Sequence, residues 1–386
     1  MLVLALSLLS FKSLADDAKA SLKSAEVTEE QAKTAIAFVE ALNKQNVDDI
    51  ANFFDLIDFG GLVISKIDTE ANIKRALAQQ YRTTEFARTF IQSSFILPQQ
   101  ASATFKYRGP VKTELFGNRP MVRLDHSDGG HEFMLLFFND ANKIIDLFYA
   151  SKGGIVSDSV AGTTQLLLPT QNRFIARLLG KEENSKETTA KFVKMLTLRN
   201  QGKFPEVLEL IQTLPESIQS HRAIVELEVL IGQNVSDESY MNALGKLNTY
   251  FGDDPSTSFM LIDYHVTVGD NESAAKSVDK AIEFWGEDAA LINLKANMLY
   301  LLGDNKAAIE QAKLGIAKEP NFEDLYWTLI ALQDLEGDFE NLTTSFREVK
   351  TRFNQNLTPQ DVLDAGTAES YLASDEFKKV LAAGEF

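Results

Sequence analysis

Two histidines and three carboxylates gather around one glycine-rich turn of the sequence, and these are residue types that bind metals. His126 and His131 flank Asp128-Gly129-Gly130, and Asp125 and Glu132 stand beside them. Imidazole and carboxylate groups are ligands for zinc. The turn is the tip of an expected hairpin, however, and surface loops of this kind are normally polar and solvated. The sequence therefore favours a solvated tip and no metal site.

The motifs of the common enzyme classes are absent from the sequence. It contains no phosphate-binding loop, no dinucleotide-binding glycine fingerprint, no His-Glu-x-x-His zinc motif and no Gly-x-Ser-x-Gly nucleophile turn. The absence of cysteine also excludes thiolate zinc sites, cysteine nucleophiles and disulfides. The sequence therefore predicts a protein that is not an enzyme and needs no cofactor.

An alternative function is left open by aromatic and charged residues in the first half of the chain. Such residues can line a ligand pocket, in which an inward-facing carboxylate could act as a catalytic acid. The candidates are Tyr81, Tyr107, Arg123, Asp146 and Tyr149. Whether Asp146 faces the pocket or the solvent depends on its parity in the strand, which the sequence leaves open. The alternative is therefore a small-ligand-binding protein or an enzyme that uses this pocket.

The elements that would hold this pocket are helices followed by strands. A capping box, Thr28-Glu29-Glu30-Gln31, opens the first expected helix. Further helices are expected over 47–59, ending near Gly60-Gly61, and over 69–95. Strands bounded by turn residues are expected over 102–108, 112–116, 120–125, 132–138 and 143–149. This order predicts an α+β domain with helices on one face of an antiparallel sheet.

The same order resembles the cystatin-like α+β fold of the nuclear-transport-factor-two-like superfamily. The resemblance rests on Phe54-Asp55-Leu56-Ile57-Asp58 and on Ile145-Asp146-Leu147-Phe148-Tyr149. It implies a cone in which a curved sheet wraps a long helix and often leaves a pocket. It implies no particular activity, because one fold hosts many functions.

The second half of the chain repeats with a fixed period. Gly269, Gly303 and Gly337 are 34 residues apart, and an aspartate follows each of them. In the unit 289–322, helices are expected over 289–300 and 307–316, with Gly303 in a left-handed turn and Asp304 or Asn305 as the cap of the second helix. A period of this length predicts stacked helical hairpins.

These units resemble the tetratricopeptide repeat (TPR) family. The family's small residues and its closing proline are matched by Ala296, Ala308, Gly315 and Pro320, whereas Leu342 stands where alanine is usual. The resemblance implies an all-α superhelix over 188–386, with about five repeats and a capping hairpin. The first helix of each repeat would line a concave groove.

The resemblance also implies which residues face that groove. They are Phe259, Asp263, Asn293, Asn297, Tyr300, Trp327 and Asp334. Amide groups can bind a peptide backbone, and aromatic rings act as anchors. The implied function is a non-enzymatic interaction or scaffold protein that binds a segment of a protein partner. The basic residues with which some family members hold a terminal carboxylate are missing at these positions, which disfavours an acidic C-terminal tail as ligand.

The start of the chain is typical of a secretory signal. An apolar run over 2–9 precedes Ser13-Leu14-Ala15, which has the small residues of a cleavage site before Asp16. No basic residue precedes the run. The alternatives are therefore a start that is placed too late in the leader, or a buried helix. The expected segments are a signal peptide (1–15), an α+β domain (16–170), a connector (171–187) and the TPR solenoid (188–386). The expected location is the bacterial periplasm or the exterior.

The net charge of −17 excludes two classes of partner. Nucleic-acid binding requires lysine and arginine against phosphates, and anionic membrane surfaces attract basic segments. No apolar stretch is long enough to span a bilayer. The acidity favours solubility or the attraction of a basic partner. The sequence leaves the oligomeric state and the identity of the protein partner open.

Overall fold

The protein is described from a computed structural model of its 386 residues. The structure describes residues 26–96, 103–127, 129–168, 185–355, 358–365 and 368–384. The expected leader 1–15 and residues 171–184 of the expected connector lie outside this description. The chain divides into two compact units, Met1–Tyr264 and His265–Phe386, which are considered separately.

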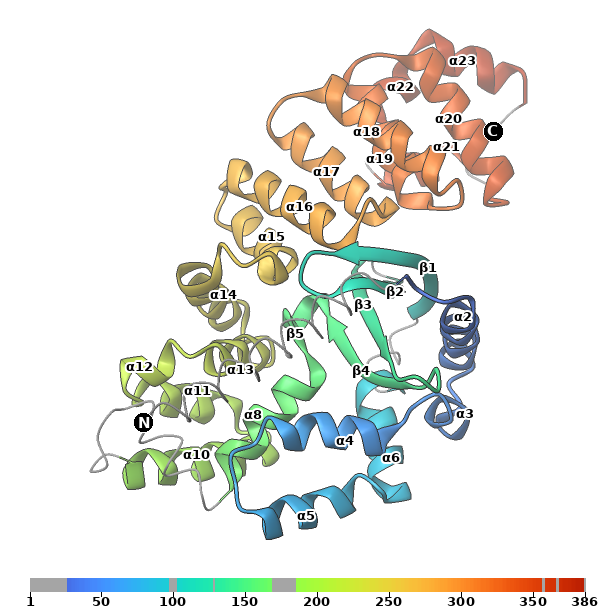
Figure 1. Cartoon of the computed structure of the whole chain (residues 1–386). Coiled ribbons are helices and arrows are strands. Elements are labelled where there is room, and N and C mark those ends of the chain that lie inside the picture. Colours follow the sequence, from blue (N-terminus) through green and yellow to red (C-terminus); the bar gives the residue numbers. More distant parts are fainter. Residues whose placement is uncertain are drawn as a thin grey trace, which may run out of the picture. The chain divides into compact units, whose positions relative to one another are not determined.

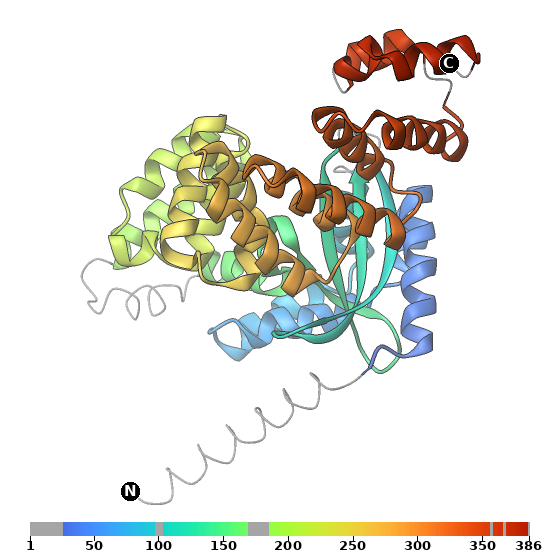
Figure 2. The same cartoon turned by 90° about the horizontal axis from the view of Figure 1, so that it is seen from above.

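The first unit contains a five-stranded antiparallel sheet whose strands follow the chain order. The strands are β1 (Ala103–Thr113), β2 (Gly117–His126), β3 (His131–Phe138), β4 (Ile144–Tyr149) and β5 (Gly154–Ile155). Helix α2 (Glu29–Lys44) lies along the sheet, and its Phe38 and Leu42 pack against Val122 and Leu136 (Figures 1 and 2). The capping box at Thr28 is confirmed, because its hydroxyl accepts the Gln31 N–H and the Gln31 side chain accepts the Thr28 N–H.

Shorter helices complete this part of the unit. They are α3 (Val47–Ala51), α4 (Leu56–Ser65), α5 (Ala71–Gln80), α6 (Thr84–Ile91), the π-helical turn η1 (Gln92–Ile96) and α8 (Val156–Leu167). Phe59 and Val63 of α4 form a second core with Tyr81 and with Ala161 of α8. The prediction of an α+β domain with helices and an antiparallel sheet is therefore confirmed.

Two expected helices were placed wrongly. The helix expected over 69–95 is interrupted after α5, and Thr83 begins α6 by accepting the Phe86 N–H. The helix expected over 47–59 ends at Ala51, and Asp55 caps α4 instead. Helix α4 continues through Gly60-Gly61. The glycine at position 60 serves close packing, because a Cβ there would clash with the Tyr81 side chain.

The two strands expected over 102–108 and 112–116 are a single strand, β1. Gly109-Pro110 suggested a break, but Gly109 adopts φ 93° and the pairing with β2 shifts register between Tyr107 and Gly109. Such a bulge absorbs one extra residue, and proline is tolerated in an edge strand. The hairpin turn follows Thr113, which pairs with Gly117.

The outer edge of β1 is partly covered by a side chain. Asn43, near the end of α2, accepts the Phe105 N–H at 2.8 Å and donates to the Phe105 carbonyl at 2.9 Å. The amide therefore pairs with both backbone groups of one residue, as a neighbouring strand would.

The rest of the first unit is helical. Its elements are α10 (Ser185–Asn200), α11 (Phe204–Gln212), α12 (Glu216–Gln219), α13 (Arg222–Gly232), α14 (Asp237–Phe251), η3 (Pro255–Thr257) and the larger part of α15 (Ser258–Thr267). Arg222 connects these helices to the segment after β4. Its guanidinium donates to the Gly153 carbonyl at 2.6 Å and to Ser256 Oγ at 2.8 Å, and it pairs with Glu226 at 2.7 Å and with Asp254.

The second unit is an array of helical hairpins (Figure 1). After the end of α15 come α16 (Asn271–Trp285), α17 (Ala289–Leu301), α18 (Asn305–Lys318), α19 (Glu323–Leu335), α20 (Phe339–Arg352), α21 (Pro359–Ala365), α22 (Glu369–Ala373) and α23 (Asp375–Ala382). Each helix from α16 to α19 packs on the helix that follows it.

The expected turn chemistry of the repeat is confirmed. Gly269, Gly303 and Gly337 have φ values of 77°, 83° and 67°. Asp304 caps α18 by accepting the Ala307 N–H at 3.0 Å. Ala296 and Ala308 are fully buried, as small residues between closely packed helices should be. The second unit is therefore an all-α array of helical hairpins.

Candidate functional site

The candidate site is the face of α17 and α19 on which the expected groove residues of the second unit lie. Asn293, Asn297 and Tyr300 are spaced at i, i+4 and i+7 and therefore share one face of α17. Both asparagines are half-buried, and Tyr300 is 43% exposed. Thr328 of α19 donates its hydroxyl to Asn293 Oδ1 at 2.8 Å. This contact brings two neighbouring hairpins together on one polar and aromatic face.

Trp327 and Asp334 of α19 also serve the packing of the unit. The Trp327 indole N–H donates to Glu323 Oε1 at 2.9 Å, and its ring lies edge-on to Phe346 at 6.1 Å between centroids. Asp334 accepts the Tyr371 N–H at 2.6 Å, and so it holds the start of α22. Because of these contacts, the Trp327 N–H and the Asp334 carboxylate are already hydrogen-bonded within the unit and have less capacity to bind a partner. Asn297 and Tyr300 are the stronger candidates.

Phe259 and Asp263, the expected groove residues of α15, belong to the first unit. The Phe259 ring lies 5.5 Å from the ring of Phe133 on β3, at an interplanar angle of 84°. Edge-to-face contacts of this kind stabilise a packed aromatic pair. Phe259 is therefore engaged with the sheet, whereas Asp263 is exposed.

The five residues of the expected pocket do not meet at one place. Tyr107 and Tyr149 pack in the core between the sheet and α2. Arg123 and Asp146 lie on the opposite face of the sheet, because their cross-strand partners are Phe133 and Phe137. Tyr81 belongs to the separate core formed by α4 and α8.

Asp146 has a structural role that its strand parity alone did not reveal. Its carboxylate accepts the Ser157 N–H at 3.1 Å and the Leu147 N–H at 2.9 Å, and it also accepts from the Ser157 hydroxyl. Burial raises the pKa of Asp146, and these hydrogen bonds offset only part of that effect. The contacts with Ser157 show that Asp146 caps the start of α8, which has no cap from its own flanking residue.

A charged network crosses the first three strands. Asp125 lies 2.6 Å from Arg123 Nε, 2.9 Å from Lys106 Nζ and 2.9 Å from His131 Nδ1. Burial acts to raise the pKa of Asp125, but the hydrogen bonds from His131 and Arg123 outweigh it and hold that pKa well below its ordinary value. Arg123 is fully buried. The sequence identified Asp125 and His131 only as a hairpin tip, since the cross-strand register that assembles the network was unknown.

Among the residues that the structure describes, no group of three or more histidine and carboxylate side chains could hold a metal ion. Asp128 of the glycine-rich turn lies outside the described residues.

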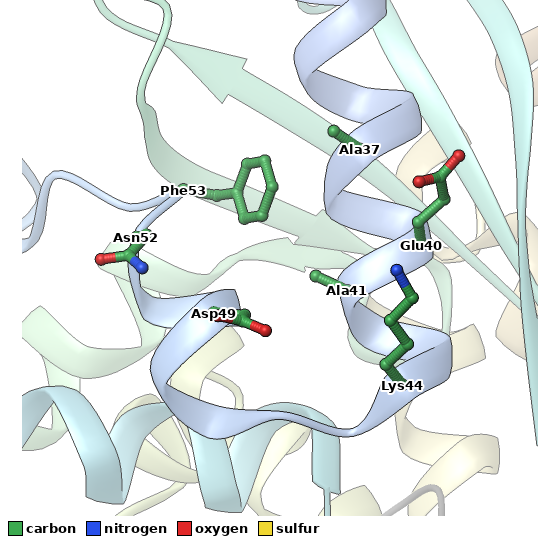
Figure 3. Close-up of a pocket in the computed structure, with 7 residues that line it drawn as sticks. All are labelled: Ala37, Glu40, Ala41, Lys44, Asp49, Asn52 and Phe53. Atoms are coloured by element: carbon green, nitrogen blue, oxygen red, sulfur yellow. The ribbon is translucent and has the colours of Figure 1, made fainter.

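A surface pocket of about 300 Å³ lies between α2 and α3 (Figure 3). It is lined by Ala37, Glu40, Ala41, Lys44, Asp49, Asn52 and Phe53. The Phe53 ring points across the pocket toward α2, and the charged side chains stand at its rim (Figure 3). This pocket was not predicted from the sequence. The sequence signal for it is the pair Ala37 and Ala41, two small side chains that share one face of α2 and leave space beside the helix.

None of the helices within the described ranges combines the length and the apolar character needed to cross a membrane.

Comparison with protein-family models and with curated proteins found no match. A solved structure described as "Crystal structure of MamA protein" aligns with 45% of this chain and 98% of that chain, at 16% sequence identity and a TM-score of 0.35. A likeness at this level carries no argument about function. The fold class rests on the chain's own elements: an antiparallel sheet with helices, followed by an all-α array of helical hairpins.

Proposed function

We propose that this protein is a non-enzymatic interaction protein whose hairpin array binds a segment of a protein partner on the face of α17 and α19. The observation that supports this most strongly is the exposed ring of Tyr300 beside Asn297, next to the point where Asn293 and Thr328 join two hairpins. Helical arrays commonly use such extended faces for binding. Exposed aromatic rings beside polar groups are typical anchors of an interface.

The proposal includes the finer assignments of family and architecture. The hairpin array is a member of the TPR family extending over 188–386, and residues 16–170 form a cone-like domain of the nuclear-transport-factor-two-like type. Supporting the first assignment are the 34-residue period and the positive φ at each repeat glycine. Supporting the second is the meander of strands packed on α2.

Replacing Tyr300 with alanine should weaken partner binding at least about thirtyfold, because loss of an interface anchor typically costs about 2 kcal/mol or more and about 1.4 kcal/mol is tenfold. Peptides selected from a displayed random library against the full chain would serve as probes, and fluorescence anisotropy would give their Kd values. The matched control is Tyr250→Ala on α14, since Tyr250 is 42% exposed against 43% for Tyr300.

Equal affinities for the wild type and Tyr300→Ala would show that the peptides bind elsewhere and would remove the α17–α19 face from consideration. A stoichiometric, tight small-molecule ligand of the full chain, found in a metabolite screen, would favour the alternative function in a pocket of the first unit.

The proposed location is outside the cytoplasm. The apolar run and the Ser13-Leu14-Ala15 segment support cleavage before Asp16, so mature protein from fractionated cells should begin at Asp16. N-terminal sequencing measures this directly. Ala15→Tyr should leave the chain uncleaved, because the residue before the cleaved bond must be small. Intact Met1 in the cytoplasmic fraction of the wild type would contradict export.

A further inference from the structure

Three successive hairpin turns of the second unit expose aliphatic side chains within three residues of the repeat glycine. Val266 and Val268 precede the first repeat glycine, Leu301 and Leu302 precede the second, and Leu335 precedes the third. These five side chains, here called the turn surface, are between 39% and 57% exposed. Single exposed leucines are ordinary on proteins, but several gathered at one place indicate an interaction site.

The turns that carry these residues are neighbours in space. The Asn271 side chain donates to the Leu301 carbonyl at 3.4 Å, and Asn305, one repeat later, donates to Glu336 Oε1 at 2.7 Å. Each asparagine therefore connects its own turn to the next. The exposed aliphatic side chains of the three turns therefore lie on neighbouring turns, and we call the row that they make the strip.

The strip is surrounded by negative charge. The three equivalent turn segments, 266–272, 300–306 and 334–340, contain seven carboxylates and a single basic residue, Lys306. The whole second unit has 22 acidic and 11 basic residues, a net charge of −11. An apolar strip bordered by carboxylates is complementary to an apolar strip bordered by lysine or arginine.

The length of the strip suits a short helix. Helices α17 and α19 are in contact, and packed helices lie about 8–10 Å apart, so three turns span roughly 20 Å. A helix rises about 1.5 Å per residue and therefore covers this distance with about 13 residues. Apolar side chains three and four residues apart would then all face the strip.

We propose that the turn surface binds a basic amphipathic helix of a protein partner. The partner's aliphatic side chains lie on Val266, Val268, Leu301, Leu302 and Leu335, and its lysines and arginines face the surrounding carboxylates. This surface adjoins the α17 face at Tyr300, which directly precedes Leu301, but its aliphatic residues are not those of the proposed groove. A second copy of this chain does not fit, because its net charge of −17 would repel the same carboxylates.

The test uses a synthetic 14-residue peptide with leucines at i, i+3 and i+4 spacing and lysines elsewhere. Its binding to the full chain is measured by fluorescence anisotropy. We expect Leu302→Ser to raise the Kd at least tenfold. Leu381→Ser on α23 is the matched control and should leave the Kd unchanged, since Leu381 is 49% exposed against 45% for Leu302. A peptide with glutamate in place of each lysine should bind at least tenfold more weakly than the lysine peptide. Added salt should weaken the binding of the lysine peptide, because it screens the attraction between opposite charges.

Equal Kd values for the wild type, Leu302→Ser and Leu381→Ser would mean non-specific attraction to an acidic protein and would overturn the proposal. Equal binding of the lysine and glutamate peptides would overturn it as well. Surface substitutions usually change stability little, so melting curves should match the wild type; Leu335→Ser replaces Leu302→Ser if they do not. Val268→Ser, in the first turn and outside α17 and α19, should weaken binding of the lysine peptide and leave the Kd values of the library peptides unchanged, which separates a failure here from a failure of the proposed groove.

Discussion

Replacing Asp125 with asparagine is expected to destabilise the protein by about 3 kcal/mol at pH 7. The substitution removes the carboxylate that accepts hydrogen bonds from the fully buried Arg123 and pairs with Lys106 and His131. Removing one member of a buried ion pair costs about 3–5 kcal/mol, because a charge stays buried without its counterion. Urea unfolding of both proteins measures the difference.

The matched control for this experiment is an exposed pair of the same kind. Asp48 pairs with Arg88 at 3.2 Å, and both side chains are largely exposed. Asp48→Asn should cost less than about 1 kcal/mol, since solvent screens such pairs. Similar losses for the two variants would show that the network on the sheet contributes no more than a surface ion pair.

The Asp125 contribution should also depend on pH in a defined direction. The pKa of Asp125 is lower in the folded protein than the value of about 3.9 in an unfolded chain. When folding lowers the pKa of a carboxyl group, the group contributes its full stabilisation at pH values above its unfolded pKa. This stabilisation is lost as the pH falls toward the folded pKa. As Asp125 becomes protonated, the gap between wild type and Asp125→Asn should therefore shrink below about pH 4. A constant gap down to pH 3 would contradict the assignment.

Substitutions at the two adjacent glycines of α4 are expected to have opposite effects. A Cβ at Gly60 would lie 2.4–2.7 Å from atoms of the Tyr81 side chain, whereas a Cβ at Gly61 would meet nothing within 4 Å. Gly60→Ala should therefore cost about 1–3 kcal/mol through overpacking. Gly61→Ala should stabilise by about 0.5–1 kcal/mol, because alanine is the better helix residue. Chemical denaturation measures both.

The pair serves as its own control, because both changes have the same effect on helix propensity. Stabilisation by both alanines would mean that Tyr81 moves away from Gly60 at little cost. The close packing of Tyr81 would then not explain why position 60 is a glycine.

The repeat could be predicted from sequence because its signals are local. Gly303 needs a left-handed backbone, and Asp304 caps the helix that begins beside it, so each residue specifies its own neighbourhood. The errors came from contacts distant in sequence. Gly60-Gly61 reads as a helix end until Tyr81 is known to pack there, and Gly109-Pro110 reads as a break until the pairing with β2 is known.

The candidate sites also differ in whether local or distant contacts decide them. The TPR resemblance predicted the groove positions of α17, and the helix period places Asn293, Asn297 and Tyr300 on one face. The expected pocket failed to assemble because its members were chosen without strand register, and Asp146 turned out to hold Ser157 eleven residues further on. The turn surface could have been found, since its aliphatic residues all stand within three positions before a repeat glycine.

The amide of Asn43 has a consequence for the behaviour of the protein at high concentration. An uncovered edge strand offers N–H and C=O groups on which the strand of another molecule can form, and that is a route to aggregation. In β1, Asn43 already pairs with both groups of Phe105, and Pro110 supplies no N–H further along. The edge of β1 therefore offers fewer free backbone groups to the strand of another molecule than a bare edge of the same length would.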